Sequence, residues 1–169
     1  MHSLPEKVQN WIGKVVITEK DVITVEKGLW QNYCAAIEDG NALYWDSEIA
    51  KEYIDGLIAP PGMLPSWVAS NEWEPTQKKR NRPMELHFLL KEALDLELGI
   101  VAGIKFKYYE PVRPGDKITS EQKLISVSKI METKLGPGRK WNIEVIYTNQ
   151  NKDLVGLQSV RMLAYTKDK

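Results

Sequence analysis

The sequence predicts an α+β fold in which helices and strands occupy different parts of the chain. Three observations support this prediction. Apolar residues recur at helical spacing in the first half, whereas residues 100–165 alternate apolar and polar side chains in four successive stretches. Short connections between those stretches indicate an antiparallel meander. An apolar segment that begins near Gly62 is expected to form a central helix, wrapped by a sheet of about five strands.

The N-terminal part supplies one more strand and the first long helix. Residues 1–13 predict a leader or short helix, and residues 14–25 are rich in Val, Ile and Thr, which favour a strand. Residues 26–40 carry the apolar stripe of a helix. Its members are Leu29, Tyr33 and Ile37. Cys34 lies beside this stripe, so we interpret it as a small core residue rather than a nucleophile.

The segment from Ile37 to Trp73 holds the polar and helix-starting signals around which we expect the chain to be organised. Residues 47–53 predict a further short helix with Asp46 or Ser47 as its cap. The central helix, from Gly62 to about Asn71, follows two prolines, which cannot donate backbone N–H bonds. Its first turn offers free N–H groups and the positive end of the helix dipole, which suit a carbonyl oxygen or a carboxylate.

The stretch from Glu74 to Leu98 has no clear pattern and predicts no element. Its basic run, residues 78–83, predicts a loop that is either solvated, as charge runs usually are, or able to hold a phosphate of a carrier molecule. His87 lies among apolar residues in the same stretch. We interpret it as a packed or interface histidine rather than a catalytic one, and His2 is the only other histidine.

The second half of the chain predicts four strands joined by turns. The strands are expected at residues 104–108, 117–130, 141–147 and 154–165. The apolar phase slips near Leu124 and Ile125, which predicts a β-bulge.

Composition limits the classes of partner and site. With 169 residues, the chain is long enough for one domain, and we expect residues 1–169 to form it. Equal numbers of basic and acidic residues, 23 of each, give a net charge of zero, so neither nucleic acid nor an anionic membrane is an expected partner. A single cysteine and the absence of an apolar signal core fit a cytoplasmic protein. With two histidines and one cysteine, no metal site is expected.

Five short segments are weak signals alone but specific in their order and spacing. They are Ile12–Lys14, Asp39–Asp46, Ile58–Leu64, Tyr108–Asp116 and Tyr147–Gln150. Together they resemble the MaoC-like dehydratases and (R)-specific enoyl-thioester hydratases, most closely the FAS1-like, or N-terminal MaoC, branch. The resemblance implies a hot-dog fold, in which an antiparallel sheet wraps around a central helix.

The chain departs from the hydratase motif of this family at one important position. The motif is an Asp, any residue, Asn, Pro, an aliphatic residue and then His. Asp39, Asn41 and Leu43 match, Ala42 replaces the proline, and Tyr44 stands where the catalytic histidine would be. Because a phenol has a pKa of about 10, Tyr44 can donate a hydrogen bond but cannot replace the histidine as a base near neutral pH.

The resemblance implies a hydratase or dehydratase subunit that acts on an enoyl-CoA or acyl-carrier thioester and needs no cofactor. Gly62 would donate a backbone hydrogen bond to the thioester oxygen, and Asp39, Asn41 and Tyr44 would complete the catalytic site. The expected substrate-binding residues are Pro61, Met63 (the candidate second backbone donor), Trp45, Arg80 and Arg82. Because the histidine is absent, a partner hot-dog chain is expected to supply the intact Asp/His pair, in a homodimer or a heterodimer.

Two other functions remain open from the sequence. Asp39 with the helix-end donors also suits a thioesterase, which would release free CoA without consuming the double bond. A non-catalytic subunit that keeps only the acyl-thioester groove is the other alternative, because the histidine is missing. Asp39 and Asn41 also have a purely structural interpretation, as turn residues that follow a helix.

Overall fold

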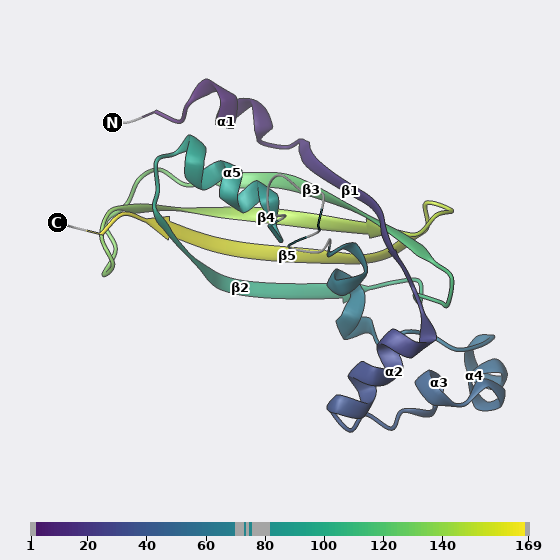
Figure 1. The fold of residues 1–169 in the computed structure, drawn as a ribbon. Helices are drawn as coiled ribbons and strands as arrows, with labels where there is room; N and C mark the ends of the chain where they lie inside the picture. Colours follow the sequence, from purple (N-terminus) through teal and green to yellow (C-terminus); the bar gives the residue numbers. More distant parts are fainter. Residues whose placement is uncertain (1–2, 70–72, 74, 76–81, 168–169) are drawn as a thin grey trace.

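The computed structural model describes residues 3–69, 73, 75 and 82–167. It contains one antiparallel sheet, with helices over one of its faces and beyond one of its ends (Figure 1). This arrangement confirms the predicted α+β class.

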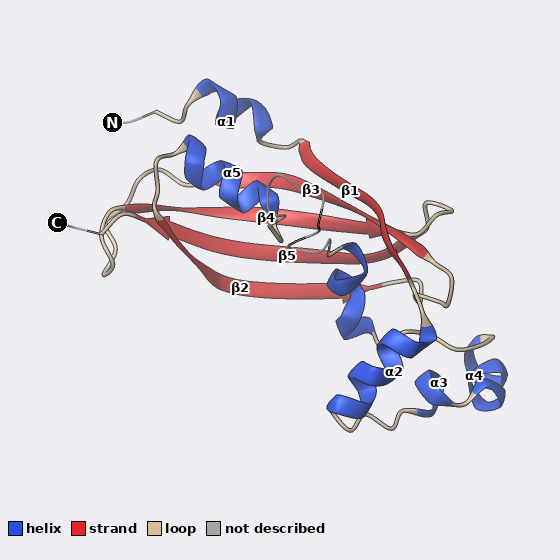
Figure 2. Ribbon diagram, viewed as in Figure 1, coloured by secondary structure: helices blue, strands red, loops and turns tan. Residues whose placement is uncertain are grey.

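The sheet has five strands in the order β1-β3-β4-β5-β2, and all neighbouring strands are antiparallel. The strands are β1 (Val15–Thr24), β2 (Leu98–Tyr108), β3 (Lys117–Val127), β4 (Gly138–Thr148) and β5 (Leu154–Tyr165). The number agrees with the predicted sheet of about five strands. β1 and β2 are therefore its two edges (Figure 2).

The helices, apart from η1, fall into two groups. The helices are α1 (Glu6–Trp11), α2 (Lys27–Ala36), α3 (Ala42–Trp45), α4 (Ser47–Ile54), η1 (Pro61–Val68) and α5 (Glu85–Ala93). α1 and α5 lie over the sheet, whereas α2, α3 and α4 form a lobe beyond the end at which β1 finishes (Figure 1). We call these three helices the helical lobe. None of the helices in the described ranges is long and apolar enough to cross a membrane.

Alternation along β3 and β4 separates a buried face from an outer face, as the sequence predicts. The alternation predicted for residues 104–108 is wrong, because β2 is an edge strand and most of its side chains are exposed. In β4 every second side chain is buried, and these residues are Trp141, Ile143, Val145 and Tyr147. The bulge predicted near Leu124 and Ile125 is also confirmed, because the register between β3 and β4 shifts between Leu124 and Ser126. The buried face of the sheet therefore forms the floor of the core on which η1 and α5 pack.

The central helix is shorter and tighter than predicted. It is a 3₁₀ helix over Pro61–Val68, and Ala69 is already extended, whereas the sequence predicts a helix to about Asn71. Pro65 lies inside it, and there a proline removes a backbone donor and its ring crowds the preceding turn. A regular α-helix is therefore disfavoured through this segment.

α5 lies in the stretch for which the sequence predicts no element. Leu86 and Leu90 are fully buried one turn apart, which is the apolar stripe of a short helix. Met84, in the left-handed conformation, precedes it where a capping Ser, Thr, Asp or Asn would have signalled its start. The first turn of the helix is instead stabilised by a side chain of the sheet: the Leu86 N–H donates to Oε1 of Gln122 on β3 (3.1 Å).

Candidate functional site

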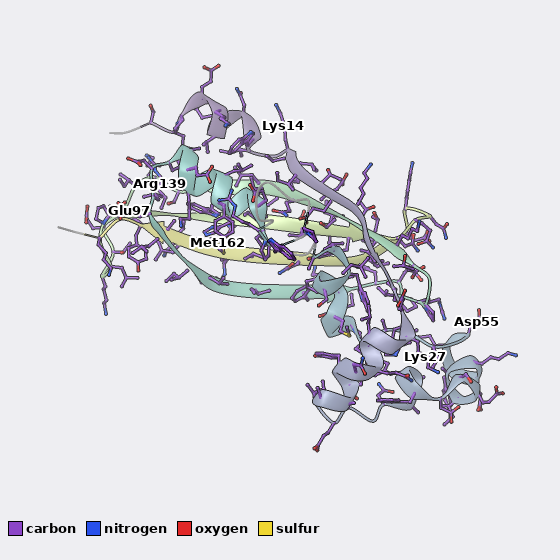
Figure 3. The ribbon with its side chains drawn as sticks, in the orientation of Figure 1. Lys14, Lys27, Asp55, Glu97, Arg139 and Met162 are labelled. Atoms are coloured by element: carbon purple, nitrogen blue, oxygen red, sulfur yellow. The ribbon has the colours of Figure 1, made fainter. Side chains whose placement is uncertain are left out.

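The helical lobe is tied to the sheet end by the turn between β2 and β3. The Arg113 guanidinium donates to the carbonyl oxygens of Ile54 (2.6 Å), Asp55 (3.2 Å) and Gly56 (3.4 Å), where α4 ends. The Ala59 N–H, just before η1, donates to the carbonyl of Val112 in the same turn (2.8 Å). These bonds fix the lobe beside the first residues of η1. Figure 3 shows Asp55 on this lobe, at the end of the molecule opposite Arg139 and Glu97.

The loop between α2 and α3 holds the acidic residue of the motif. Oδ1 of Asp39 accepts the N–H of Asn41 (3.1 Å), and Oδ1 of Asn41 accepts the N–H of Leu43 and caps α3 (3.1 Å). The indole N–H of Trp45 donates to the carbonyl of Asp39 (2.8 Å). Asn41 therefore acts as a turn and cap residue. Asp39 is only partly engaged, since its second carboxylate oxygen keeps its capacity as an acceptor.

The Asp39 carboxylate lies close to two protonated groups. Burial raises the pKa of the Tyr44 phenol above its usual value, and the negative charge of Asp39 raises it further. The pKa of the Cys34 thiol is raised by the same two causes in the same order. Cys34 is fully buried, as predicted for a core residue. Tyr44 therefore stays protonated near neutral pH and is suited to donate a proton or a hydrogen bond, not to remove a proton.

The start of η1 comes close to this group through Tyr33 of α2. Gly62 is the second residue of η1, so no carbonyl within the helix can accept its N–H. The phenol oxygen of Tyr33 lies 3.8 Å from the point that a Cβ on Gly62 would occupy. Tyr33 also contributes to the raised pKa of Tyr44, although its effect is the smallest. Tyr33 thus lies near Gly62 and also acts on Tyr44, on which the charge of Asp39 acts as well.

The sequence predicts Tyr33 only as a member of the apolar stripe of its helix, with no role in the site. It remains 38% exposed, unlike a core residue. Its position in the last turn of α2, close in sequence to Asp39, is the only local signal for a role in the site.

The predicted substrate-binding residues beside the lobe differ in their surroundings. The Met63 N–H donates to the carbonyl of Pro60 (3.0 Å), so the expectation that Met63 adds a second free backbone donor is wrong. Pro61 is exposed beside Gly62. Trp45 keeps 38% of its surface exposed on the lobe.

The predicted phosphate contacts are less favoured. The Arg82 guanidinium donates to both carboxylate oxygens of Glu85 (2.9 and 2.7 Å) and to Glu92 (2.9 Å). The positive charge of Arg82 is therefore paired with two carboxylates of the same chain. This pairing weighs against a contact between Arg82 and a carrier phosphate. Arg80 lies outside the described residues.

His87 is a packed histidine and lies away from the helical lobe. Its ring packs against Phe88 and Trp141, and it is 6% exposed on α5, above the sheet. Burial, with a smaller effect of the Lys91 charge, lowers its pKa to about 4. The imidazole is therefore neutral and enclosed, and within the described residues no other histidine is available to the Asp39 site. The described residues also include no cluster of three His, Cys, Asp or Glu side chains that would hold a metal ion.

Comparison with known proteins identifies the family to which this geometry belongs. The model described as FAS1-like, dehydratase domain region matches residues 10–158. A probable enoyl-CoA hydratase alpha subunit from Thermomonospora curvata is 25% identical over 173 residues, which cover 97% of this chain and 52% of that protein. The chain thus spans about half the length of this relative.

Two solved structures share the fold. A chain of the ChsH1-ChsH2 complex from Mycobacterium tuberculosis superposes with a TM-score of 0.77 at 19% identity, over 96% of this chain and 90% of that one. The MaoC-like dehydratase from Rhodospirillum rubrum gives a TM-score of 0.59 at 16% identity, over 92% and 95%. These likenesses confirm the predicted hot-dog fold. Because the family model covers most of the chain, the protein belongs to the FAS1-like dehydratase domain region family.

Proposed function

We propose that the chain is one subunit of a hydratase or dehydratase that acts on CoA or acyl-carrier thioesters. One observation carries this proposal: the Tyr33 phenol lies beside the start of η1, where the Gly62 N–H has no acceptor within the helix, and the charge of Asp39 acts on the nearby Tyr44. No imidazole is among these residues. Such a site can hold a thioester oxygen and a water, but it lacks a strong base. A partner hot-dog chain would therefore supply the histidine.

The reaction requires charge stabilisation at the thioester oxygen. When the water oxygen bonds to the β-carbon, the partner's histidine would take the proton that the water loses, and the π electrons move to the thioester oxygen. The α-carbon of this enolate then takes a proton and completes the addition. The Gly62 N–H and the Tyr33 hydroxyl would donate to the enolate-like oxygen. Asp39 would orient the water, while Tyr44, which stays protonated, would donate a hydrogen bond. This addition needs only proton transfer and hydrogen bonding, so the proposal includes no cofactor.

The free edge of β2 is the surface that we assign to the partner chain. Among the described strands, β2 pairs only with β5, so its other row of backbone groups is open to a further strand. Its large apolar side chains remain 43–54% exposed, and they are Ile100, Val101, Ile104 and Tyr108. One relative is an alpha subunit, and one structural neighbour was solved as a two-protein complex. Both support a partner that is a different chain of the same fold, rather than a second copy of this chain.

Turnover by the separate and combined chains tests the proposal. The full chain would be purified alone and with a hot-dog chain encoded beside it, and given crotonyl-CoA and bulkier enoyl-CoAs. We expect loss of the enoyl-thioester absorbance only when both chains are present. Equal turnover by this chain alone would contradict the partner requirement. Release of free CoA without loss of the double bond would indicate a thioesterase, and tight binding without turnover in every combination a non-catalytic subunit.

Assembly through the β2 edge gives a second test. Ile104→Ala removes apolar surface that the partner would cover, which should weaken the complex by about 1 kcal/mol, or about fivefold in Kd. Ile125→Ala is the matched control, because Ile125 is 41% exposed on β3, away from this edge. Sedimentation of mixtures at several concentrations measures both. Equal weakening by the two variants would contradict the assignment of the β2 edge.

A further inference from the structure

A row of polar residues crosses the buried face of the sheet beneath η1. The paired positions along this row, from β1 through β3, β4 and β5 to β2, are Glu19, Ser120, Tyr147, Gly156 and Tyr108. Ser120 and Tyr147 are 1% and 2% exposed. Polar groups at this depth need partners, because an unpaired buried group is costly.

The side chains of this row bond to two glutamines of the neighbouring row. The Ser120 hydroxyl and the Gln122 amide both donate to Oε2 of Glu19 (3.1 and 3.4 Å). The Tyr147 hydroxyl donates to Oε1 of Gln158 (2.5 Å). Burial, followed by the charge of Glu19, raises the pKa of Tyr147, so this phenol keeps its proton. The arrangement is thus two small hydrogen-bonded groups set side by side.

These two groups face a cavity of about 100 Å³ between the sheet and η1. Its polar floor consists of Glu19, Ser120, Gln122, Tyr147 and Gln158, and its apolar walls consist of Pro65, Val68, Ala69, Pro83, Met84 and Val145. At about 30 Å³ per water, the volume suits a group of a few heavy atoms. An occupant with an apolar body and a polar end would match both surfaces.

The floor retains hydrogen-bonding capacity of both kinds. Oε1 of Glu19 can accept a hydrogen bond, because the bonds above use Oε2. The Gln158 amide nitrogen can donate two, because the bond above uses only its Oε1. A hydroxyl both donates and accepts, so it can donate to Glu19 or accept from Gln158. A methyl end would satisfy neither, and a carboxylate end would face the negative charge of Glu19.

We propose that this cavity binds a hydroxyl group carried at the far end of the acyl chain. The inference rests on the proposed function, since it places the thioester oxygen at Gly62. The same helix forms both places: at a 3₁₀ rise of about 2 Å per residue, Pro65 and Val68 lie about 6 and 12 Å along η1 from Gly62. A medium-length acyl chain that follows η1 from its first turn would bring its end to the polar floor.

Binding of three matched thioesters tests the inference without requiring turnover. Calorimetry with the full chain, alone and with its partner, would use decanoyl-CoA, ω-hydroxydecanoyl-CoA and the corresponding ω-carboxylate. We expect the hydroxylated compound to bind about tenfold more tightly than decanoyl-CoA, and the carboxylate to bind more weakly than either. If decanoyl-CoA binds and the hydroxyl adds nothing, the cavity assignment is wrong and the proposed function stands. If no thioester binds, both are wrong.

One substitution and its matched control test whether Glu19 causes the preference for the hydroxyl. Glu19→Gln keeps the size of the side chain but removes its charge, and it should reduce the preference for the hydroxyl severalfold and improve binding of the carboxylate. Glu121→Gln is the matched control, because Glu121 lies next to Ser120 on β3 and points to the other face of the sheet. The same change in both variants, or in neither, would overturn the proposal. Circular dichroism of each variant verifies that the sheet is intact.

Discussion

Tyr33→Phe should lower kcat of the assembled hydratase by about 10²-fold, the usual effect of removing one donor from an oxyanion site. The phenol oxygen lies 3.8 Å from the Cβ position of Gly62, the residue whose N–H would hold the thioester oxygen. The donor would act mainly on the enolate-like oxygen of the transition state, so KM should change little. Stability should also change little, because Tyr33 is 38% exposed and phenylalanine preserves its ring.

Tyr53→Phe is the matched control for this experiment. Tyr53 lies on α4 of the same helical lobe and is 74% exposed, so loss of its hydroxyl should leave kcat unchanged. Infrared spectra of bound decanoyl-CoA with a ¹³C-labelled carbonyl give a readout that a structural role would not affect. Tyr33→Phe should move the carbonyl band toward its position in free thioester. A wild-type band without any shift would contradict the site as a whole, and an unchanged shift in the variant would contradict Tyr33 alone.

The central strands could be predicted because alternation is visible within each of their own segments of sequence. In β4, Trp141, Ile143 and Val145 alternate with polar neighbours, and this period is set by burial of one face alone. The bulge at Leu124 was predictable for the same reason, since one extra residue reverses the phase. The 3₁₀ form of η1 and the existence of α5 could not be predicted, because both depend on the distant residues against which these helices pack.

The site shows the same division between local and distant contacts. Asp39, Asn41 and Tyr44 lie in one loop, so a motif could identify them together. Tyr33 could not be assigned in this way, because its role depends on Gly62, which is brought back beside α2 by the turn that anchors the lobe. The polar row beneath η1 requires the register of all the strands, and no single segment contains it.

Acid should destabilise the protein by about 3 kcal/mol between pH 7 and pH 4 through His87 alone. The pKa of His87 is lowered from 6.5 to about 4, chiefly by burial and secondarily by Lys91. The unfolded chain therefore takes up a proton near pH 6.5, whereas the folded protein does not until about pH 4. This contribution to stability is fully present above pH 6.5 and is lost progressively as the pH falls toward 4.

His87→Leu isolates this effect from the titration of carboxylates, because leucine cannot ionise and is similar in size. Urea unfolding at several pH values gives the free energy of unfolding of each protein, and the decline from pH 7 to pH 4 should be about 3 kcal/mol smaller in the variant. The comparison is internal to each protein, so any packing cost of leucine cancels. Equal declines would mean that the imidazole is protonated within the fold. That outcome would contradict its enclosure between α5 and the sheet, and it would restore His87 as a candidate base.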